Sequence, residues 1–423
     1  MLWRYLGLQT ATKAERYATF WVALMFFATL AGMFLLRPIR NQFGVAWGVE
    51  GMPELYALTL LATVALVLPF WSLANRMSSR RFVPIALHLG SLALVLLAAA
   101  FWWIGDYQWQ QQPWIGKVFW GGFSALNLAL PALVWIHAVE HFGKGQAKRL
   151  FGLIAVGGTL GAMLGSWLAA TDGLPTWSIA LLSGGLLQLA LFAFVRSRVH
   201  CNQLEGGATT DKVATGGILQ GLAIVVRDRR ALQIAIYMML VGFVATAFEA
   251  GQTQLIGEEI GRARQQMTFL ADVGLYGNAL VLLLQIFCTG RLLTRMPAVV
   301  LLSSLPVVSI IGLVLYSVAP TAGVIFVLQV GRRGANYAIE KPAREVLYTP
   351  LDLATKHKVK FLLDTFALRL GDLSGALVQV WLREQGLGVT AIVTVTIVFA
   401  CAWIGVACML GRSQTGGVSK SKI

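Results

Sequence analysis

The chain has 423 residues, of which 57% are hydrophobic and only 13% are charged, and its mean hydropathy is +0.70. Soluble proteins carry roughly 25% charged residues, so this composition excludes a soluble protein of two or three domains. The apolar runs are long and unbroken, which excludes a transmembrane β-barrel built from alternating strands. The formal net charge of +15 would indicate nucleic-acid binding only in a soluble chain.

Apolar runs recur along the whole chain at the length of about 20 residues that an α-helix needs to cross a bilayer. Lipid offers the backbone no hydrogen bonds, so each run must be helical. We predict an all-α membrane protein with twelve transmembrane helices over residues 17–36, 54–74, 82–104, 114–140, 149–170, 176–195, 231–250, 269–290, 297–316, 320–339, 361–382 and 388–411.

Most of the 34 Lys and Arg residues lie in every second gap between these runs, including Arg332 and Arg333 at the end of the tenth. Basic loops stay in the cytoplasm, so both termini are predicted to be cytoplasmic. The longest gap is also basic, with six helices before it and six after it. We therefore predict an N-terminal bundle (1–195), a cytoplasmic linker (196–230) and a C-terminal bundle (231–423), as in the major facilitator fold.

A faint internal repeat supports two related halves. The fifth run contains glycines at 157, 161 and 165 and ends in Trp167-Leu168. The eleventh run contains Gly371 and Gly375 and ends in Trp381-Leu382. Glycines four residues apart are typical of close helix packing in membranes.

Charges at membrane depth cost several kcal/mol, with estimates from about 3 to above 10, so they are candidates for function. The first run ends with Arg37 and Arg40 around Pro38, which is predicted to break the helix there. The two arginines either extend to the interface or form a clamp that binds phosphate or carboxylate. Glu249 ends the seventh run and is predicted to contact substrate, carry a proton or pair with one of these arginines.

Further charged groups are candidates for gating or coupling. Glu140 lies between His137 and His141, where an interfacial cluster, a gate or a metal site are alternatives, but further metal ligands are lacking nearby. Pro342 marks a predicted helix break after the tenth run, within a group that is either a cytoplasmic loop, a gate or the second half of the clamp. That group contains Glu340, Lys341 and Arg344.

The eleventh run contains Asp364, Arg369 and Asp372. Arg369 and Asp372 are three residues apart and are predicted to pair on one helix face; gating is the alternative. The four cysteines have no CxxC spacing. We expect no metal, no cofactor and no nucleic acid, and we expect a monomer in a lipid bilayer.

Several blocks resemble the nucleotide translocases of plastids and intracellular bacteria, which exchange ATP and ADP. Residues 36–41 are similar to their Leu-Arg-Asp-x-Lys-Asp motif, and residues 341–351 to their Asp-Pro-x-Lys-Glu-x-x-Tyr-x-Pro-Leu motif. Residues 147–153 and 369–376 resemble two further segments, and the order and spacing agree from about residue 17 to 385.

The resemblance implies that Arg40, Arg344 and Glu249 contact the substrate, because these positions match two lysines and an acid associated with nucleotide transport. Pro38 and Lys341 replace acidic residues of the two motifs, and both matching lysines are arginine here. Positive charge is retained, so the resemblance implies an anionic substrate.

We therefore predict a secondary transporter of the bacterial inner membrane that moves an anionic organic solute by alternating access, with nucleotide exchange by an antiporter as one option. Alternatives are proton-coupled import or export of a phosphorylated metabolite, a peptide-like anion or a siderophore. A further alternative is a non-transporting membrane sensor. Motifs of metalloproteases, serine hydrolases and Walker-type ATPases are missing, so an enzyme is not expected.

Overall fold

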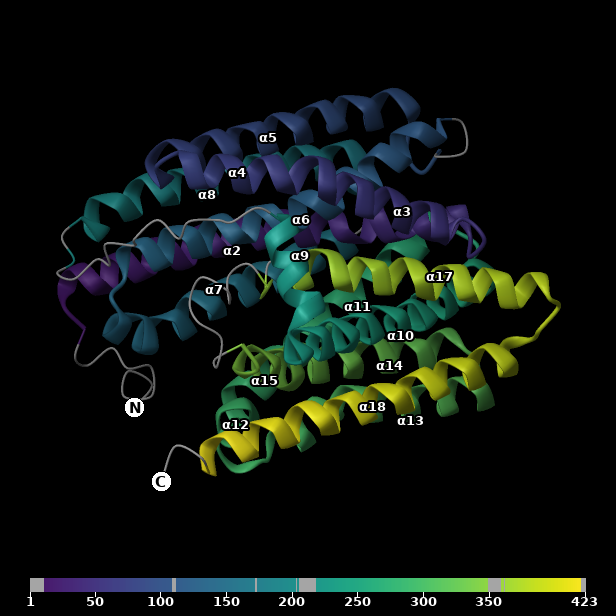
Figure 1. The fold of residues 1–423 in the computed structure, drawn as a ribbon. Coiled ribbons are helices and arrows are strands. Elements are labelled where there is room, and N and C mark those ends of the chain that lie inside the picture. Colours follow the sequence, from purple (N-terminus) through teal and green to yellow (C-terminus); the bar gives the residue numbers. More distant parts are fainter. Residues whose placement is uncertain are drawn as a thin grey trace. The chain divides into compact units, whose positions relative to one another are not determined.

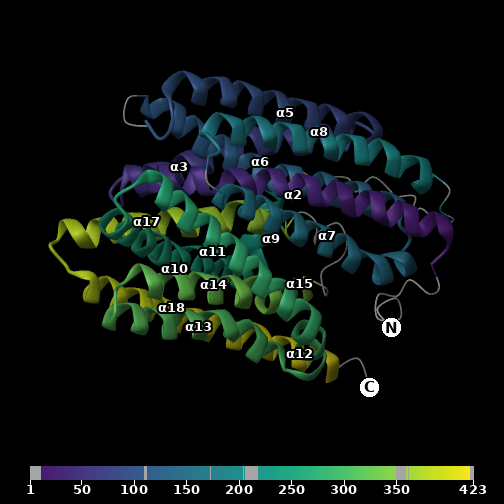
Figure 2. The same ribbon diagram turned by 180° about the vertical axis from the view of Figure 1, so that it is seen from behind.

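The computed structural model describes residues 11–108, 112–171, 173–202, 204, 218–348, 359–360 and 362–419. These residues are almost entirely helical and contain no strand (Figures 1 and 2). The chain divides into two compact units. Unit 1 comprises Met1–Phe43, Leu61–Val213 and Arg262–Leu275, and unit 2 comprises Gly44–Leu60, Ala214–Gly261 and Tyr276–Ile423.

Most helices lie within one unit. Unit 1 contains most of α2 (Lys13–Trp47) and all of η2 (Thr63–Val67), α4 (Leu68–Arg76), α5 (Ser79–Ile104), α6 (Pro113–His141), α7 (Lys144–Ala170) and α8 (Thr176–Cys201). Unit 2 contains α9 (Ile218–Arg227), α10 (Arg229–Glu259), η3 (Gln285–Thr289), α12 (Gly290–Arg295), α13 (Ala298–Val318), α14 (Ala322–Ala335), η4 (Asn336–Glu340), α15 (Lys341–Val346), η5 (Leu363–Ala367), α17 (Leu368–Glu384) and α18 (Val389–Ser419). Besides the end of α2, two further helices contribute to both units, namely α3 (Met52–Ala62) and α11 (Ala263–Leu284).

Ten helical stretches among the described residues are long and apolar enough to cross a membrane. The chain is thus a multi-pass membrane protein. The other two predicted runs are also helical, since α14, η4 and α15 follow one another without a gap, as do η5 and α17. These two stretches carry the buried charges described below, which lowers their hydropathy. The predicted linker and bundle boundaries stay a prediction, and residues 205–217 of that linker lie outside the described residues.

In unit 1, α7 packs against α2 through glycines spaced four apart. A Cβ at Gly161 would overlap the backbone carbonyl of Phe27, and one at Gly165 would overlap that of Ala31. A backbone atom cannot move aside as a flexible side chain can, so these positions fix how closely the helices approach. Elsewhere in unit 1, α5 lies beside α8 (Figures 1 and 2).

The same kind of contact recurs in unit 2 between α17 and α10. A Cβ at Gly371 would overlap the carbonyl of Met239, and one at Gly375 would meet Phe243 and Thr246. The glycine spacing in the fifth and eleventh predicted runs therefore reflects equivalent helix packing in each unit. In unit 2, α13 also lies beside α18 (Figures 1 and 2).

The expectation that two prolines end helices is wrong. Pro38 lies inside α2, which continues to Trp47. Pro342 follows the π-helical turn η4, and the helix continues through α15. A proline removes one backbone donor and crowds the preceding turn, and membrane helices accommodate this by local widening because every other backbone group still needs its helical bond.

The start of α11 belongs to unit 1 because Arg264 holds it there. The guanidinium donates to the carbonyl oxygens of Thr171 and Leu174, the latter at 3.3 Å, and to the hydroxyl of Tyr107 at 3.4 Å. Burial raises the pKa of Tyr107, and the positive charge of Arg264 partly opposes this rise. Residues from the second half of the sequence thus complete unit 1.

Candidate functional site

Glu249 is the acidic group of a polar cluster inside unit 2. Its carboxylate accepts a hydrogen bond from the hydroxyl of Tyr56 on α3. Tyr56 is 3% exposed and packs with Met52, Ala250 and Ala376. Glu249 does not end its helix as expected, since α10 continues to Glu259.

Arg332 on α14 supplies the positive charge next to Glu249. Its side chain is buried, with the guanidinium carbon 4.1 Å from the ring centre of Phe248 and Nε donating to Ser309 Oγ at 3.2 Å. The Glu249 carboxylate interacts electrostatically with this guanidinium. Cation, carboxylate, phenol and hydroxyl therefore meet among apolar helices, and we call Tyr56, Glu249, Ser309 and Arg332 the interior cluster.

The interior cluster lies deep along its helices. The backbone N–H of Ala322 donates to the Glu259 carboxylate at 3.1 and 3.0 Å, so the end of α10 and the start of α14 are at the same level. Glu249 precedes Glu259 by 10 residues, and Arg332 follows Ala322 by 10 residues. At 1.5 Å per residue, both lie about 15 Å from that level, which is half of a hydrocarbon core of ~30 Å.

The sequence alone does not indicate that Arg332 is a site residue, because two arginines near the end of an apolar run resemble the basic flank of a cytoplasmic loop. The signal that could have identified Arg332 is its position within the predicted run 320–339, several residues before the end of that run. Its neighbour Arg333 lies against Gly277 of α11 instead. Only the helix packing distinguishes the two arginines.

In unit 1, Arg40 lies on an aromatic surface. The guanidinium carbon of Arg40 on α2 is 3.6 Å from the ring centre of Trp120 on α6, and Nη1 donates to Asn41 Oδ1 at 3.1 Å. Arg37 lies over Phe34 of its own helix at 5.2 Å. Such cation–π contacts keep a guanidinium partly desolvated.

Arg344 is buried in unit 2 and paired within its own helix. Nη1 lies 3.3 Å from Oε1 of Glu340, which has no exposed surface, and Oε2 of Glu340 has no hydrogen-bond partner among the described residues. Asp364 and Lys341 also contribute to the electrostatic environment of Glu340. The structure thus brings together four predicted site residues, with Arg344 already neutralised by a carboxylate.

Two further ion pairs lie close to this group. Lys360 Nζ is 2.5 Å from Glu345 Oε2, and Arg369 Nη1 is 2.9 Å from Asp372 Oδ2. The predicted pairing of Arg369 with Asp372 is confirmed. Asp372 also lies where α17 approaches Gly242 of α10, so this pair belongs to the packed interface between those helices.

His137 and Glu140 belong to a separate group in unit 1. His137 is fully buried, its Nε2 is 2.7 Å from Ser197 Oγ, and its ring lies 4.5 Å from that of His141. The carboxylate of Glu140 interacts electrostatically with Arg198 on α8. No group of three His, Cys, Asp or Glu side chains that could hold a metal occurs in the part of the chain that the structure describes.

Predicted site residues therefore fall into distinct groups. Arg37, Arg40 and Glu140 are in unit 1, whereas Glu249 and Arg344 are in unit 2. Within unit 2, Glu249 accepts a hydrogen bond from Tyr56 and interacts electrostatically with Arg332, whereas Arg344 forms an ion pair with Glu340.

No protein-family model matches the chain, and no curated protein matches it significantly. Solved structures do match over nearly their full length. A nucleoside transporter, NupG, is 13% identical with a TM-score of 0.63, and the match covers 94% of this chain and 98% of that one.

Two other transporters give similar values. An auto-inhibited POT family peptide transporter is 12% identical with a TM-score of 0.60, covering 93% of this chain and 96% of that one. A bacterial homologue of the human lysosomal transporter Spinster, inward-facing and unoccupied, is 12% identical with a TM-score of 0.57, covering 95% and 98%. At these low identities, the likenesses show that the chain shares the fold of these three transporters.

Proposed function

We propose that the chain is a secondary transporter that moves an organic solute bearing negative charge by alternating access. The proposal includes twelve membrane-spanning helices, both termini in the cytoplasm, a monomeric state and residence in a bacterial inner membrane. The fold and the charge distribution of the loops support it. The matched nucleoside and peptide transporters are consistent with an organic solute.

The observation that carries the proposal is the burial of Arg332 next to Glu249 among apolar helices. An intramembrane charge is costly, and such residues generally face a binding cavity or a partner. A guanidinium binds carboxylate or phosphate with paired donors. We propose that the anionic group of the solute competes with Glu249 for Arg332, and that Tyr56 holds the carboxylate while Arg332 is engaged.

Arg40 and Arg37 contribute positive charge from unit 1 in this mechanism, and the buried Trp120 ring supports the Arg40 guanidinium. Arg344 has a different environment, because its charge is balanced by Glu340. Its proposed role in substrate binding therefore requires that the ion pair opens during transport. Glu140, Lys341, Asp364, Arg369 and Asp372 remain proposed gating or coupling residues.

The resemblance to nucleotide translocases favours exchange of ATP and ADP as the first substrate pair to test. Phosphorylated metabolites, peptide-like anions and siderophores are the alternatives, with Glu249 as the proton carrier if transport is proton-coupled. All of these share a carboxylate, a phosphate or another anionic oxygen group that Arg332 can bind.

The experiment is uptake of labelled nucleotides, nucleosides, sugar phosphates and acidic dipeptides into proteoliposomes, with and without an internal counter-substrate. We expect uptake of at least one anionic solute. Arg332→Gln should reduce it at least tenfold, Arg332→Lys less, and Glu249→Gln should alter its dependence on pH. The control is Arg295→Gln, because Arg295 is exposed at the end of α12.

Uptake of only neutral solutes would contradict the anionic substrate. Full uptake by a folded Arg332→Gln protein would contradict the role of the interior cluster. Size-exclusion profiles and thermal unfolding of each variant separate loss of transport from loss of folding.

A further inference from the structure

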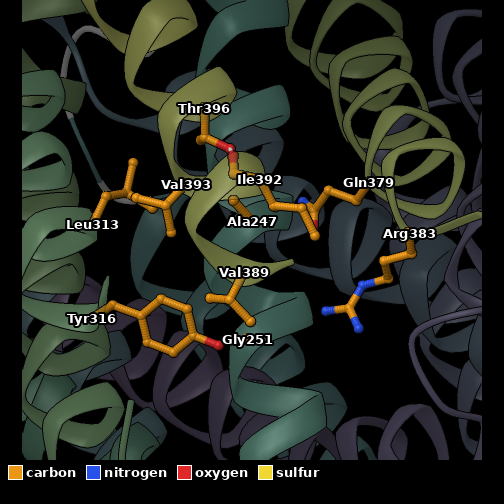
Figure 3. Close-up of a pocket in the computed structure, with 10 residues that line it drawn as sticks. All are labelled: Ala247, Gly251, Leu313, Tyr316, Gln379, Arg383, Val389, Ile392, Val393 and Thr396. Atoms are coloured by element: carbon orange, nitrogen blue, oxygen red, sulfur yellow. Dashed lines mark hydrogen bonds between the residues drawn. The ribbon is translucent and has the colours of Figure 1, made fainter. Parts of the chain in front are cut away.

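A small pocket opens inside unit 2, between α10, α13, α17 and α18 (Figure 3). Its polar lining consists of Tyr316, Gln379, Arg383 and Thr396, and the rest is apolar. Its free volume is about 20 Å³. A void needs about 10–15 Å³ on this measure to hold one water molecule, so the pocket has room for a small species of that size.

The pocket lies where the repeated glycine pattern lacks its third glycine in unit 2. In unit 1, Gly165 lies two residues before Trp167 and approaches Ala31 of α2. In unit 2, the residue two positions before Trp381 is Gln379. Glycines at 371 and 375 let α17 meet α10 closely, whereas Gln379 lines the void together with Ala247 of α10.

Hydrogen-bond donors converge on this void. Gln379 is 4% exposed, and it is one of the polar residues that line the void. In Figure 3 the guanidinium of Arg383 and the hydroxyl of Tyr316 both extend toward the same space. The Thr396 hydroxyl donates a hydrogen bond to the carbonyl oxygen of Ile392, with 2.7 Å between the two oxygens. The Thr396 oxygen can therefore act only as a weak acceptor in the pocket.

The charge of Arg383 is not balanced by a carboxylate. Nη2 donates to the neutral Gln254 Oε1 at 2.7 Å, while the buried Nε has no partner among the described residues. No salt bridge of Arg383 occurs in that part of the chain. Gln254 in turn donates to Glu258 at 2.8 Å, and the Glu258 carboxylate also interacts electrostatically with Tyr316.

We propose that this pocket binds a small inorganic anion of the size of chloride, held by Arg383, Gln379 and Tyr316. A guanidinium and two neutral hydrogen-bond donors line the void. This lining favours an anion over a cation, because the positive charge of Arg383 would repel a cation. The site is distinct from the interior cluster and does not depend on the transported solute.

The test compares thermal unfolding of the purified protein in sodium chloride, bromide and gluconate at equal ionic strength. We expect chloride and bromide to raise Tm saturably by roughly 2 °C or more relative to gluconate, because a ligand that binds only the folded state stabilises it by mass action. Arg383→Lys and Gln379→Leu should abolish the halide-dependent rise, whereas Arg295→Gln should retain it.

Anomalous diffraction from crystals grown in bromide provides the second measurement and needs no variant. A bromide peak between Arg383 and Gln379 supports the site. Equal Tm in halide and gluconate, or a water molecule without anomalous signal in the pocket, would overturn the proposal. A halide effect that persists in both pocket variants would overturn it as well, since the anion would then bind elsewhere.

Discussion

The hydroxyl of Tyr56 donates a hydrogen bond to the carboxylate of Glu249, although the two residues are 193 positions apart in the sequence. Tyr56 lies at the start of the second predicted run, and Glu249 lies at the end of the seventh. Through this bond and its packing with Ala250 and Ala376, the segment Gly44–Leu60 belongs to unit 2. A membrane-embedded carboxylate is thereby held in one position beside Arg332.

Replacing Tyr56 by Phe tests this bond. The ring packing is kept and the donor to Glu249 is lost, so we expect the free energy of unfolding to fall by about 1–3 kcal/mol, the range for hydrogen bonds to charged groups. Uptake should fall as well, because Glu249 is no longer fixed beside Arg332. Thermal unfolding and proteoliposome uptake measure the two effects.

The matched control is Tyr276→Phe, because that side chain is 56% exposed. It should leave both stability and uptake nearly unchanged. Equal effects of the two substitutions would show that the Tyr56 hydroxyl contributes nothing specific.

Because Glu340 and Arg344 form a buried ion pair, we expect their substitutions to have non-additive effects on the free energy of unfolding. Glu340→Leu or Arg344→Met alone leaves one buried charge uncompensated, and such changes cost about 3–5 kcal/mol. The double variant removes both charges, so we expect it to be more stable than either single variant. The double-mutant cycle is completed by measuring the free energy of unfolding of the unmodified protein, the two single variants and the double variant in the same detergent.

Uptake by the double variant then separates two roles of Arg344. If a folded double variant transports normally, Arg344 serves only to balance Glu340. If it folds and does not transport, Arg344 acts on the solute or on the conformational change.

Helix packing at Gly161 predicts a position-specific effect of a single methyl group. Gly161→Ala forces Cβ against the Phe27 carbonyl, and overpacking of this kind costs about 1–3 kcal/mol. Gly185→Ala on α8 meets no atom within 4 Å and should be neutral or stabilising by up to about 1 kcal/mol, because alanine is the better helix former. Gly161→Ala should therefore lower the melting temperature relative to the unmodified protein, whereas Gly185→Ala should leave it unchanged or raise it. A stabilised Gly161→Ala protein would refute the close contact.

Substitutions of Arg264 and of Arg262 provide a second matched comparison. Arg264→Gln removes charged hydrogen bonds to the carbonyls of Thr171 and Leu174, which are worth about 1.5–3 kcal/mol each, so we expect a clear loss of thermal stability. Arg262 is exposed, and Arg262→Gln should change stability by no more than about 0.5 kcal/mol. Equal melting temperatures of the two variants would mean that Arg264 does not anchor α11 to unit 1.

Much of the fold was accessible from the sequence because lipid imposes a simple rule on composition. A helix must be apolar over its membrane-facing length, so ten of the predicted runs are recognisable from hydropathy alone. The pairing of Arg369 with Asp372 was also predictable, since residues three apart share a helix face. The glycine spacing at 157 and 161 indicated close packing but not the partner helix.

Prolines and buried charges were harder to interpret. Pro38 and Pro342 suggested breaks, yet both helices continue, because tertiary packing and a π turn offset the lost backbone bond. Arg332 lies within a predicted run, but nothing in the local sequence distinguishes it from its neighbour Arg333. Its burial follows from Phe248 and Ser309, which come from two other helices.

The sequence by itself determined that the chain crosses a membrane many times and that charged residues occur within its helices, since the transfer free energy of side chains depends on their type. Only the tertiary structure decided which charges meet. Contacts such as Tyr56 with Glu249, Arg332 with Ser309 and Arg40 with Trp120 join different helices. They depend on the rotation and approach of each helix, and those are set by packing between side chains far apart in the sequence.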